Sequence, residues 1–443
     1  MKGISVIKEA SYTVLSIIGE QKYINKTIYV KSNYTIIKNL EKSVLYYSCL
    51  TGELIEVFDM STSYQYLVSH WFLIQEKYDE KKDIFKIQKL VRLIGKNSKK
   101  GYNYFEILTT TRCNANCFYC YESSFEKMTM NSNTAKDIVN FINRNKLSNE
   151  ITIRWYGGEP LINQNAIDLI CTYLKNYNIN YNSMMISNGF LFNTKNISKA
   201  VNLWQLKNVR ITIDGTEDIY NKVKDFKYST SCPFKKILSN IDELILAGIS
   251  VTIRLNIEMY NLEDNKILID LLCEKYLGNK LIDFKLYLLN NTLNNSTIEN
   301  KENKSYLCEE LILLKFKIFE KGFNVNGGQL RGISKHYCLA DSGRFLLIKP
   351  NGGIAYCSED FNQKHYGFIN DDIHNLKAPN LYEYLSIKTE ICDDCPLYAT
   401  CTPSVLCPAC KQPICDELQK KLLLKDLEIS ILQEHRNYHL NRI

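Results

Sequence analysis

The sequence predicts an α/β fold built on a parallel β-sheet, with a smaller α+β region before it and a cysteine-rich region after it. Three observations support this prediction. Between residue 101 and about residue 325, six short apolar strands alternate with amphipathic helices, which is typical of parallel βα units. Residues 1–100 show β-type alternation followed by helical periodicity, and residues 326–443 show little periodicity but many cysteines until a final helix.

The N-terminal region begins with strand-like segments and continues into helices. TIYVKSNYTIIKNL and SVLYYSCLTGELIEVF are rich in β-branched and aromatic residues, and helical periodicity follows around residues 62–76 and 83–95. We therefore expect a small α+β module at residues 1–100.

The central region, residues 101–325, is expected to place its strands at YFEILTT, ITIRWY, SMMISN, VRITID, SVTIRLNI and FKLYLL. Segments between them, such as AKDIVNFINRN and NAIDLICTYLKN, have the periodicity of helices that cover a sheet. In parallel sheets and barrels the reactive groups gather at the carboxyl ends of the strands. We therefore look for functional residues at those ends.

Composition and charge exclude several classes of protein. Hydrophobic residues make up 45% of the 443 residues and charged residues 23%, which is ordinary globular usage. The net charge is +7, but the lysines are scattered, so we expect no nucleic-acid partner. No stretch reaches the roughly 18 apolar residues of a membrane-spanning helix, and the N-terminus lacks the features of a secretion signal. We expect a cytoplasmic protein without a membrane partner.

Sixteen cysteines in a reducing compartment indicate metal binding or catalysis rather than disulfides. One cluster, CNANCFYC, directly follows the first central strand and contains Cys113, Cys117 and Cys120. A second cluster lies in the C-terminal region and comprises Cys338, Cys357, Cys392, Cys395, Cys401, Cys407, Cys410 and Cys415. The other five cysteines are isolated and are expected to be core or surface thiols.

The first cluster offers three soft ligands. Three thiolates can hold a cubane of four irons so that one iron keeps an open position. A zinc site completed by a remote histidine is the alternative, but none of the six histidines lies near this loop. The spacing Cys113-x3-Cys117-x2-Cys120, with Tyr119 before the third cysteine, resembles the signature of the radical S-adenosylmethionine enzymes.

The resemblance implies a partial (β/α)6 TIM-like barrel with a 4Fe-4S cluster. In that family S-adenosylmethionine chelates the open iron, and its reductive cleavage gives a 5′-deoxyadenosyl radical that abstracts hydrogen from carbon. The second strand ends in WYGGEP, which resembles the family's GGEP motif, so Gly157, Gly158 and Glu159 are implied to hold the methionine amino group. The third strand ends in ISNGF, where Ser187 and Asn188 match the family's (S/T)NG loop.

The fourth and fifth strands carry weaker matches. ITIDGTEDIYNKVK resembles the family's motif after the fourth strand, which implies that Thr212 and Asp214 lie at the edge of the cofactor. This sequence departs from the motif, since Tyr220 replaces a histidine and Lys224 replaces the arginine that would bind the cofactor carboxylate. A lysine cannot make the bidentate contact of an arginine. Arg254, in IRLNI, is expected near the same rim.

The C-terminal cysteines resemble a SPASM extension, which implies two auxiliary 4Fe-4S clusters. The outer cluster would be held by Cys392, Cys395, Cys401 and Cys415. The inner cluster would be held by Cys338, Cys357 and one or both of Cys407 and Cys410, and the sequence leaves this choice open. A zinc ribbon, with Cys392 and Cys395 facing Cys407 and Cys410, is the alternative, but it would leave four of the eight cysteines without a metal.

SPASM enzymes mostly modify peptides and proteins. The resemblance therefore implies an oxidoreductase that acts on a ribosomally made precursor peptide (a RiPP maturase) and forms a thioether or carbon-carbon crosslink. The alternative is an anaerobic sulfatase maturase, which converts Cys or Ser to formylglycine. In those enzymes an acidic residue follows the cysteine that matches Cys357, whereas Ser358 stands here. This difference disfavours formylglycine chemistry.

The first 100 residues resemble the leader-binding module of peptide maturases, which captures a precursor leader as an added strand. A packing extension is the alternative reading of these residues. A low-potential electron donor such as flavodoxin or ferredoxin is implied as a second partner. A non-radical iron-sulfur electron-transfer protein is a further alternative, which the intact GGEP and NG loops disfavour.

Overall fold

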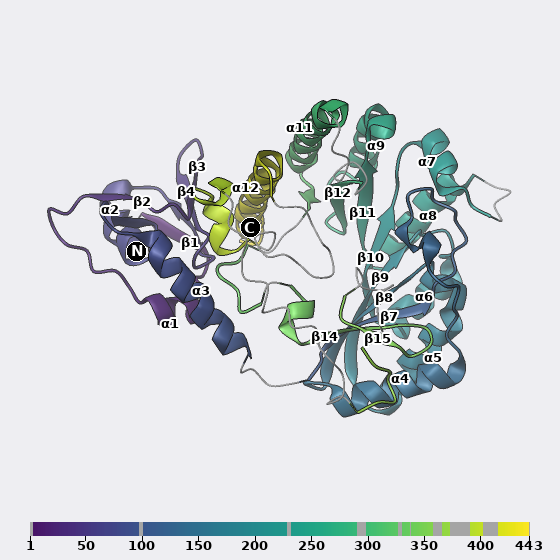
Figure 1. The fold of residues 1–443 in the computed structure, drawn as a ribbon. Helices are drawn as coiled ribbons and strands as arrows, with labels where there is room; N and C mark the ends of the chain where they lie inside the picture. The colour runs from purple at the N-terminus through teal and green to yellow at the C-terminus, as the bar shows by residue number, and fades with distance from the viewer. Residues whose placement is uncertain are drawn as a thin grey trace. The chain divides into compact units, whose positions relative to one another are not determined.

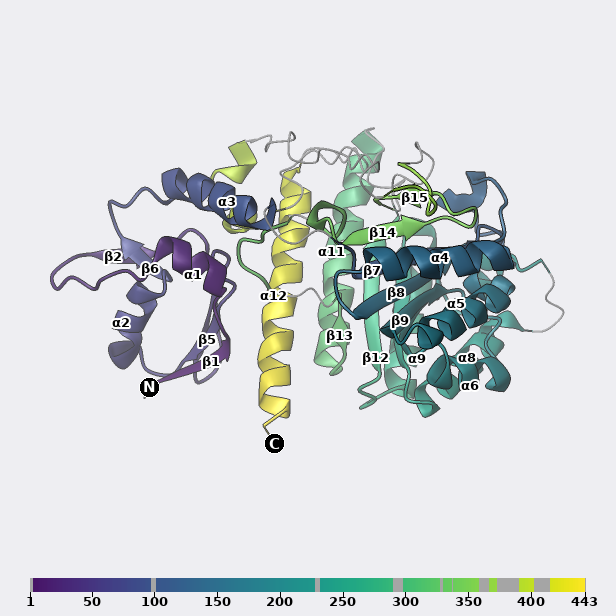
Figure 2. The same cartoon turned by 90° about the horizontal axis from the view of Figure 1, so that it is seen from below.

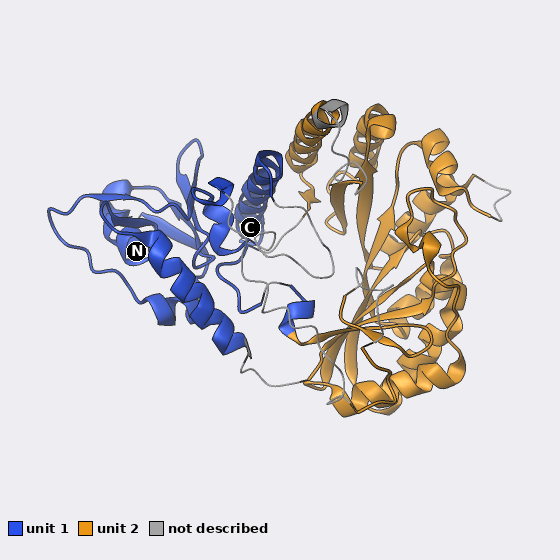
Figure 3. Ribbon diagram, viewed as in Figure 1, with its two compact units in different colours: residues 1–98, 327–342, 381–443 blue, residues 99–326, 343–380 orange. Residues whose placement is uncertain are grey.

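The computed structural model describes residues 3–96, 101–227, 232–289, 298–326, 330–336, 338–357, 366–372, 390–401 and 415–442. The chain forms two compact units, coloured blue and orange in Figure 3. Unit 1 combines residues 1–98, 327–342 and 381–443, and unit 2 combines residues 99–326 and 343–380. The cysteine-rich region therefore contributes to both units.

Unit 2 contains a nine-stranded sheet in the order β13-β12-β11-β10-β9-β8-β7-β14-β15. Its strands are β7 (Tyr104–Thr110), β8 (Glu150–Gly157), β9 (Asn180–Ser187), β10 (Leu206–Thr212), β11 (Ser250–Ile257), β12 (Ile282–Leu288), β13 (Asn324–Val325), β14 (Phe345–Ile348) and β15 (Ile354–Ala355). Strands β7 to β13 are parallel, β14 adds to β7 in parallel, and β15 is antiparallel to β14. The six predicted central strands are confirmed as β7 to β12.

Helices follow the strands and lie along the outer face of this sheet (Figures 1 and 2). They are α4 (Ser132–Asn145), α5 (Gln164–Asn176), α6 (Thr194–Asn202), α7 (Glu217–Lys224), α8 (Pro233–Leu246), α9 (Leu262–Lys275) and α11 (Ile298–Glu320). In β8 the apolar Ile151, Ile153 and Trp155 are buried, while Arg154 and Tyr156 on the opposite, inner face are only half-buried. This alternation gives the α/β partial barrel that the sequence predicts.

Unit 1 contains a four-stranded antiparallel sheet in the order β1-β5-β4-β3 and a two-stranded sheet of β2 and β6. The strands are β1 (Ile4–Lys8), β2 (Tyr29–Lys31), β3 (Thr35–Asn39), β4 (Val44–Ser48), β5 (Leu54–Val57) and β6 (Leu73–Gln75). The helices are α1 (Tyr12–Ile18), α2 (Met60–Ser69), α3 (Glu80–Lys96) and α12 (Glu417–Leu440), with short 3-10 turns at Glu390–Cys392 and Pro396–Ala399.

The helix expected around residues 62–76 is shorter than predicted. It ends at Ser69, because Trp71 adopts a left-handed backbone with φ of 65°, and Leu73–Gln75 then pairs with β2. The helix expected at residues 83–95 is confirmed within α3.

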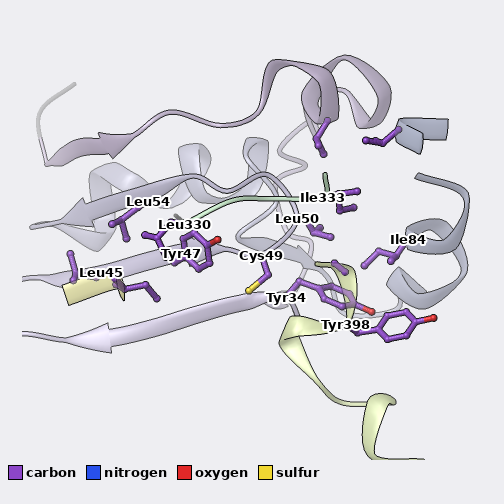
Figure 4. Packing of buried hydrophobic residues seen from close by; sticks show 14 residues of the cluster. Tyr34, Leu45, Tyr47, Cys49, Leu50, Leu54, Ile84, Leu330, Ile333 and Tyr398 are labelled. Atoms are coloured by element: carbon purple, nitrogen blue, oxygen red, sulfur yellow. The ribbon is translucent and has the colours of Figure 1, made fainter. Parts of the chain in front are cut away.

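The core of unit 1 is built from segments far apart in the sequence. Tyr47 and Cys49, on and after β4, pack in one apolar cluster with Leu330, Ile333 and Tyr398 (Figure 4). The Tyr47 hydroxyl also donates to the Arg331 carbonyl at 3.0 Å. The N-terminal strands therefore share their core with residues from the last third of the chain.

Within the described part of the chain, no helix has the length and apolar character needed to cross a membrane.

Candidate active site

Three cysteines line one pocket at the carboxyl end of β7. Cys113, Cys117 and Cys120 lie in the loop that leaves this strand and enters the 3-10 turn Tyr121–Ser124, and all three are partly buried. The pocket has a volume of about 670 Å³ and is also bordered by Gly158. Among the described residues that line it there is no histidine and no fourth cysteine. The three predicted ligands are thus brought together.

The cysteine loop is fixed by backbone hydrogen bonds to the last residue of α7 and to the segment that follows it. The Asn116 amide donates to the Lys224 carbonyl at 2.9 Å, and the Lys227 amide donates to the Asn114 carbonyl at 2.9 Å. The Lys227 ammonium also donates to the Cys113 carbonyl at 3.2 Å. The end of the fourth βα unit therefore orients the loop that follows the first strand.

Two glycines at the end of β8 allow a close approach to the cysteine loop. A Cβ on Gly157 would lie 2.1 Å from the Thr110 carbonyl oxygen, and one on Gly158 would lie 2.3 Å from that of Arg112. Gly157 also has a φ of 119°, which L-residues with side chains rarely adopt. Glu159, which follows Gly158, donates its backbone amide to the Arg112 carbonyl at 2.9 Å. Glycine is needed here to bring Glu159 beside the pocket.

The Glu159 side chain is fully buried and connects the ends of β8 and β9. It accepts from the Ser187 hydroxyl at 3.0 Å on each oxygen and from the Asn188 amide at 2.8 Å. Burial raises the pKa of Glu159 to about 7, although these hydrogen bonds and that from the Leu161 amide lower it. The Asn188 side chain in turn donates to Asn114 Oδ1 at 2.7 Å. Ser187 and Asn188 therefore position Glu159 and contact the cysteine loop.

Asp214 lies at the centre of a second buried network. Its Oδ2 accepts from the Tyr119 hydroxyl at 2.5 Å and from the Lys224 ammonium at 2.8 Å, and its Oδ1 accepts from Asn256 Nδ2 at 3.0 Å. Burial alone would lower the pKa of Lys224, but Asp214 and Tyr119 raise it well above its ordinary value. Lys224 is therefore a charged residue whose ammonium is already paired with Asp214.

Thr212 and Arg254 lie opposite each other in the β10–β11 ladder. Arg254 Nε donates to Asn256 Oδ1 at 3.0 Å, and its guanidinium lies 5.1 Å from the centre of the Tyr287 ring. Because Asn256 also donates to Asp214, Asn256 links Arg254 to Asp214.

A row of basic side chains on the inner face of the sheet is a feature that sequence reasoning missed. Arg154, Arg210, Arg254 and Lys285 come from β8, β10, β11 and β12. Among the described residues, only Arg154 of these four forms an ion pair with a carboxylate, that of Glu106. Arg210 Nε is buried and has no hydrogen-bond partner in the part of the chain that the structure describes. Burial, with Arg210 and Arg254 nearby, lowers the pKa of Lys285. The signal was present, since IRW, VRI, IRL and FKL each place one basic residue between apolar ones.

The C-terminal cysteines are described only in part. Cys392 and Cys395 lie near Cys415, whose pKa is raised by burial and by these two neighbouring thiols. Cys401 is partly buried at the end of the same described segment. Cys338 belongs to unit 1 and Cys357 to unit 2, so their joint ligation of one cluster stays a prediction. Cys407, Cys410 and Ser358 lie outside the described residues.

The partial parallel barrel has three cysteines in one pocket after its first strand and Gly157-Gly158-Glu159 at the end of its second. A family model described as the Radical SAM superfamily matches residues 107–272. The protein MJ0907 of Methanocaldococcus jannaschii is 30% identical over 285 residues, which cover 63% of this chain and 93% of that protein. The chain belongs to the radical S-adenosylmethionine superfamily, and it is an enzyme.

Other relatives extend the similarity beyond this domain. The radical SAM cyclopropyl synthase TigE of Paramaledivibacter caminithermalis is 24% identical over 338 residues, covering 67% of this chain and 66% of TigE. Among solved structures, anSMEcpe with bound AdoMet superposes with a TM-score of 0.58 at 15% identity over 76% of this chain and 99% of its own. SuiB of Streptococcus suis, bound to its precursor peptide SuiA, gives a TM-score of 0.53 at 14% identity over 88% and 99%. The chain shares its fold with both solved structures, anSMEcpe and SuiB.

The superfamily implies a 4Fe-4S cluster and S-adenosylmethionine, and the pocket residues fit this pair. The pocket offers three thiols and no other soft ligand among the described residues that line it, which suits a cluster with one open iron. Burial, together with Glu159, raises the pKa of Cys113 to about 11, so this thiol stays neutral at pH 7 unless a cation binds it. The volume of the pocket is within the range of small-molecule sites.

Proposed function

We propose that this enzyme is a peptide maturase that crosslinks a ribosomally made precursor through a thioether or carbon-carbon bond. When bound, the cluster and S-adenosylmethionine supply a 5′-deoxyadenosyl radical by reductive cleavage. The observation that carries the proposal is the pocket in which Cys113, Cys117 and Cys120 lie together at the barrel rim beside the buried Glu159 network. Either crosslink removes two hydrogen atoms from the peptide, one to the radical and one as a proton with its electron passed on.

The residues around the pocket then take distinct roles. Cys113, Cys117 and Cys120 would hold the cluster. The Glu159 carboxylate, with the backbone of Gly157 and Gly158, would bind the methionine amino group, because a buried carboxylate oriented by Ser187 and Asn188 is an acceptor for an ammonium.

The Asp214 network would form the other side of the cofactor site. Tyr119 and Lys224 are positioning residues in this proposal, since both side chains are directed to Asp214. Thr212 and Arg254 face the inner side of the sheet next to it and would border the rest of the cofactor. A free carboxylate of the cofactor would have to compete with Asp214 for the Lys224 ammonium.

The C-terminal cysteines would carry two auxiliary 4Fe-4S clusters that accept the electron released at ring closure. Cys392, Cys395 and Cys415 lie near one another, which supports the outer cluster, for which Cys401 would be the fourth ligand. The inner cluster would be held by Cys338, Cys357 and one or both of Cys407 and Cys410. A flavodoxin or ferredoxin would supply the electron that begins each turnover.

A peptide substrate is supported by the relatives. SuiB was solved with its precursor peptide SuiA and anSMEcpe with the Cp18Cys peptide, so this fold accommodates peptides in both. TigE, a relative by sequence, is named a radical SAM cyclopropyl synthase. Since anSMEcpe is a sulfatase maturase, formylglycine formation is the second candidate.

The open edge of β3 supports a leader-binding role for the first 100 residues. The backbone bonds from Cys49 to Tyr34 and from Leu40 to Ser43 fix the ladder between β3 and β4. In this register Ile37 and Asn39 direct their amides and carbonyls away from β4, and within the described residues these groups have no partner. An extended leader peptide would add there as a fifth strand.

The radical chemistry is tested by the release of 5′-deoxyadenosine. Anaerobically reconstituted protein, given dithionite and S-adenosylmethionine, should release this product, and Cys113→Ala should not. Cys232→Ala is the matched control, because this exposed thiol is isolated in the sequence, and it should keep full activity. Equal product from the Cys113→Ala protein would refute the assignment.

The substrate class is tested with peptides encoded beside this reading frame. Co-expression should lower the mass of the true precursor by two hydrogen atoms per crosslink, whereas a sulfatase fragment that gains an aldehyde would favour the second candidate. Leader binding should weaken in Ile37→Pro, which loses the open amide, but not in Ile37→Ala, which keeps it. Equal affinities for the two variants would rule out strand addition at β3.

A further inference from the structure

A cluster of two histidines and one glutamate lies in unit 1, which does not contain the three-cysteine pocket. Glu56 is on β5, and His435 and His439 are one turn apart on α12, the helix drawn in yellow in Figure 1. Glu56 Oε2 lies 3.3 Å from His435 Nε2 and 3.0 Å from His439 Nε2. The three ligand atoms all lie within 4.8 Å of one another.

The sequence spacing explains why the imidazoles converge. Residues four apart on a helix project from the same face, so His435 and His439 are directed to the same point. Their rings are 4.6 Å apart between centres and inclined by 65°, so the rings are not stacked in parallel. Each Nε2 atom lies within 3.3 Å of the same carboxylate oxygen, Glu56 Oε2.

The Glu56 carboxylate is oriented for a ligand. Its other oxygen, Oε1, accepts from the Ser43 hydroxyl at 2.6 Å, which leaves Oε2 directed at the two imidazoles. A hydrogen bond of this kind to the second oxygen is the usual support of a carboxylate ligand in metal sites. The side chain is 6% exposed, so bulk water does not solvate the carboxylate well.

A simple ion pair accounts for only part of this arrangement. His439 is within hydrogen-bond geometry of Glu56, but the buried Nε2 of His435 has no hydrogen-bond partner among the described residues. A bound cation would occupy the lone pairs of both Nε2 atoms and of Oε2. With metal–ligand distances of about 2.0–2.2 Å in tetrahedral zinc sites, neighbouring ligand atoms lie roughly 3.3 Å apart. The distances from Glu56 Oε2 to the two Nε2 atoms, 3.3 Å and 3.0 Å, are close to this value.

We propose that Glu56, His435 and His439 bind a divalent transition-metal ion such as Zn²⁺. Two imidazoles and one carboxylate suit borderline metals, whereas Mg²⁺ and Ca²⁺ require mainly oxygen ligands. Three protein ligands leave one position for water, and His439, with its side chain 47% exposed, gives the ion access from solvent. The ion joins the last turns of α12 to β5, so it would stabilise the attachment of the C-terminal helix within unit 1.

Zinc binding to the anaerobically reconstituted protein tests the proposal, because cysteines that hold a cluster are not available to zinc. Zinc bound per chain is measured after equilibrium dialysis against ZnCl₂. His439→Ala, at a half-exposed position, and Glu56→Gln, which keeps the Ser43 contact, should each bind one zinc ion fewer than the parent chain. Zinc should also raise the unfolding temperature of the parent chain and not that of either variant.

His70→Ala is the matched control. His70 also lies against a buried glutamate in unit 1, with Nδ1 2.9 Å from Glu53 Oε2, but no second imidazole of the described residues joins it in a ligand group. This variant should bind as much zinc as the parent chain. Equal zinc in the parent, His439→Ala and Glu56→Gln proteins would overturn the proposal, and so would the loss of one zinc ion in His70→Ala.

Discussion

The ion pair of Asp214 and Lys224 is expected to be a strong stabilising coupling in the barrel. Asp214 is fully buried and the Lys224 side chain is 4% exposed, so neither charge is solvated by water. Asp214→Asn leaves a buried ammonium without a carboxylate, and the cost of breaking such a pair is about 3–5 kcal/mol. Lys224→Met leaves the carboxylate with Tyr119 and Asn256 as donors, so we expect a smaller loss, about 2–3 kcal/mol.

The double variant should lose much less than the sum of the two single variants, because it contains no unpaired charge. We expect a coupling free energy of about 2–3 kcal/mol. The assay is urea unfolding of the four proteins followed by tryptophan fluorescence, since Trp155 and Trp204 are both buried in unit 2.

An exposed ion pair provides the reference for this cycle. Lys317 and Asp270 lie 2.7 Å apart with side chains 39% and 55% exposed, and their coupling should be about 0–1 kcal/mol. If Asp214→Asn and Lys224→Met were additive within about 0.5 kcal/mol, the buried pair would not differ from this exposed one. That result would refute the expectation that the buried pair of Asp214 and Lys224 is a strong stabilising coupling.

Three other predictions concern the pocket, the inner face of the sheet and the N-terminal module. Gly158→Ala places a Cβ 2.3 Å from the Arg112 carbonyl oxygen, and the displacement should lower the rate of 5′-deoxyadenosine release about a hundredfold. Arg210→Ala should raise the KM for a precursor with acidic residues about tenfold, and leave the KM for its Asp→Asn counterpart unchanged if the basic row contacts the substrate. Burial raises the pKa of Glu80 above 4.5, so the folded chain binds its proton more tightly and stability should fall as pH rises from 4.5 to the raised value. In Glu80→Gln, the free energy of unfolding measured in urea should depend less on pH across this range. An unchanged slope would contradict the raised pKa of Glu80.

The barrel strands could be predicted because their apolar, β-branched runs are local patterns. β14 could not be placed in the same way, since it pairs in parallel with β7 although some 240 residues separate them, and no local pattern identifies a distant partner. The segment of α7 is only eight residues long and largely polar, so few apolar residues mark it as a helix. Its importance lies in its last residue, Lys224, whose ammonium reaches Asp214.

The candidate site was predictable to the level of strand ends and not beyond. The motifs placed Glu159, Ser187 and Asp214 at one rim, but the register of β9, β10 and β11 decides which atoms meet. The contact of Asn256 with Asp214 depends on that register. The basic row was overlooked because each residue, such as Arg210, looks locally like one polar position in an alternating strand. Only the parallel arrangement of four strands brings the charges together.

The core of unit 1 combines early and late segments of the chain, and this has a consequence during its synthesis. Leu330, Ile333 and Tyr398 complete an apolar cluster begun by the first 98 residues. At roughly 5–20 residues per second, a ribosome needs on the order of tens of seconds to reach them. During that interval the nascent N-terminal strands expose an unfilled apolar face while the barrel is still being made. A chaperone that covers this apolar face would protect the chain from aggregation during that interval.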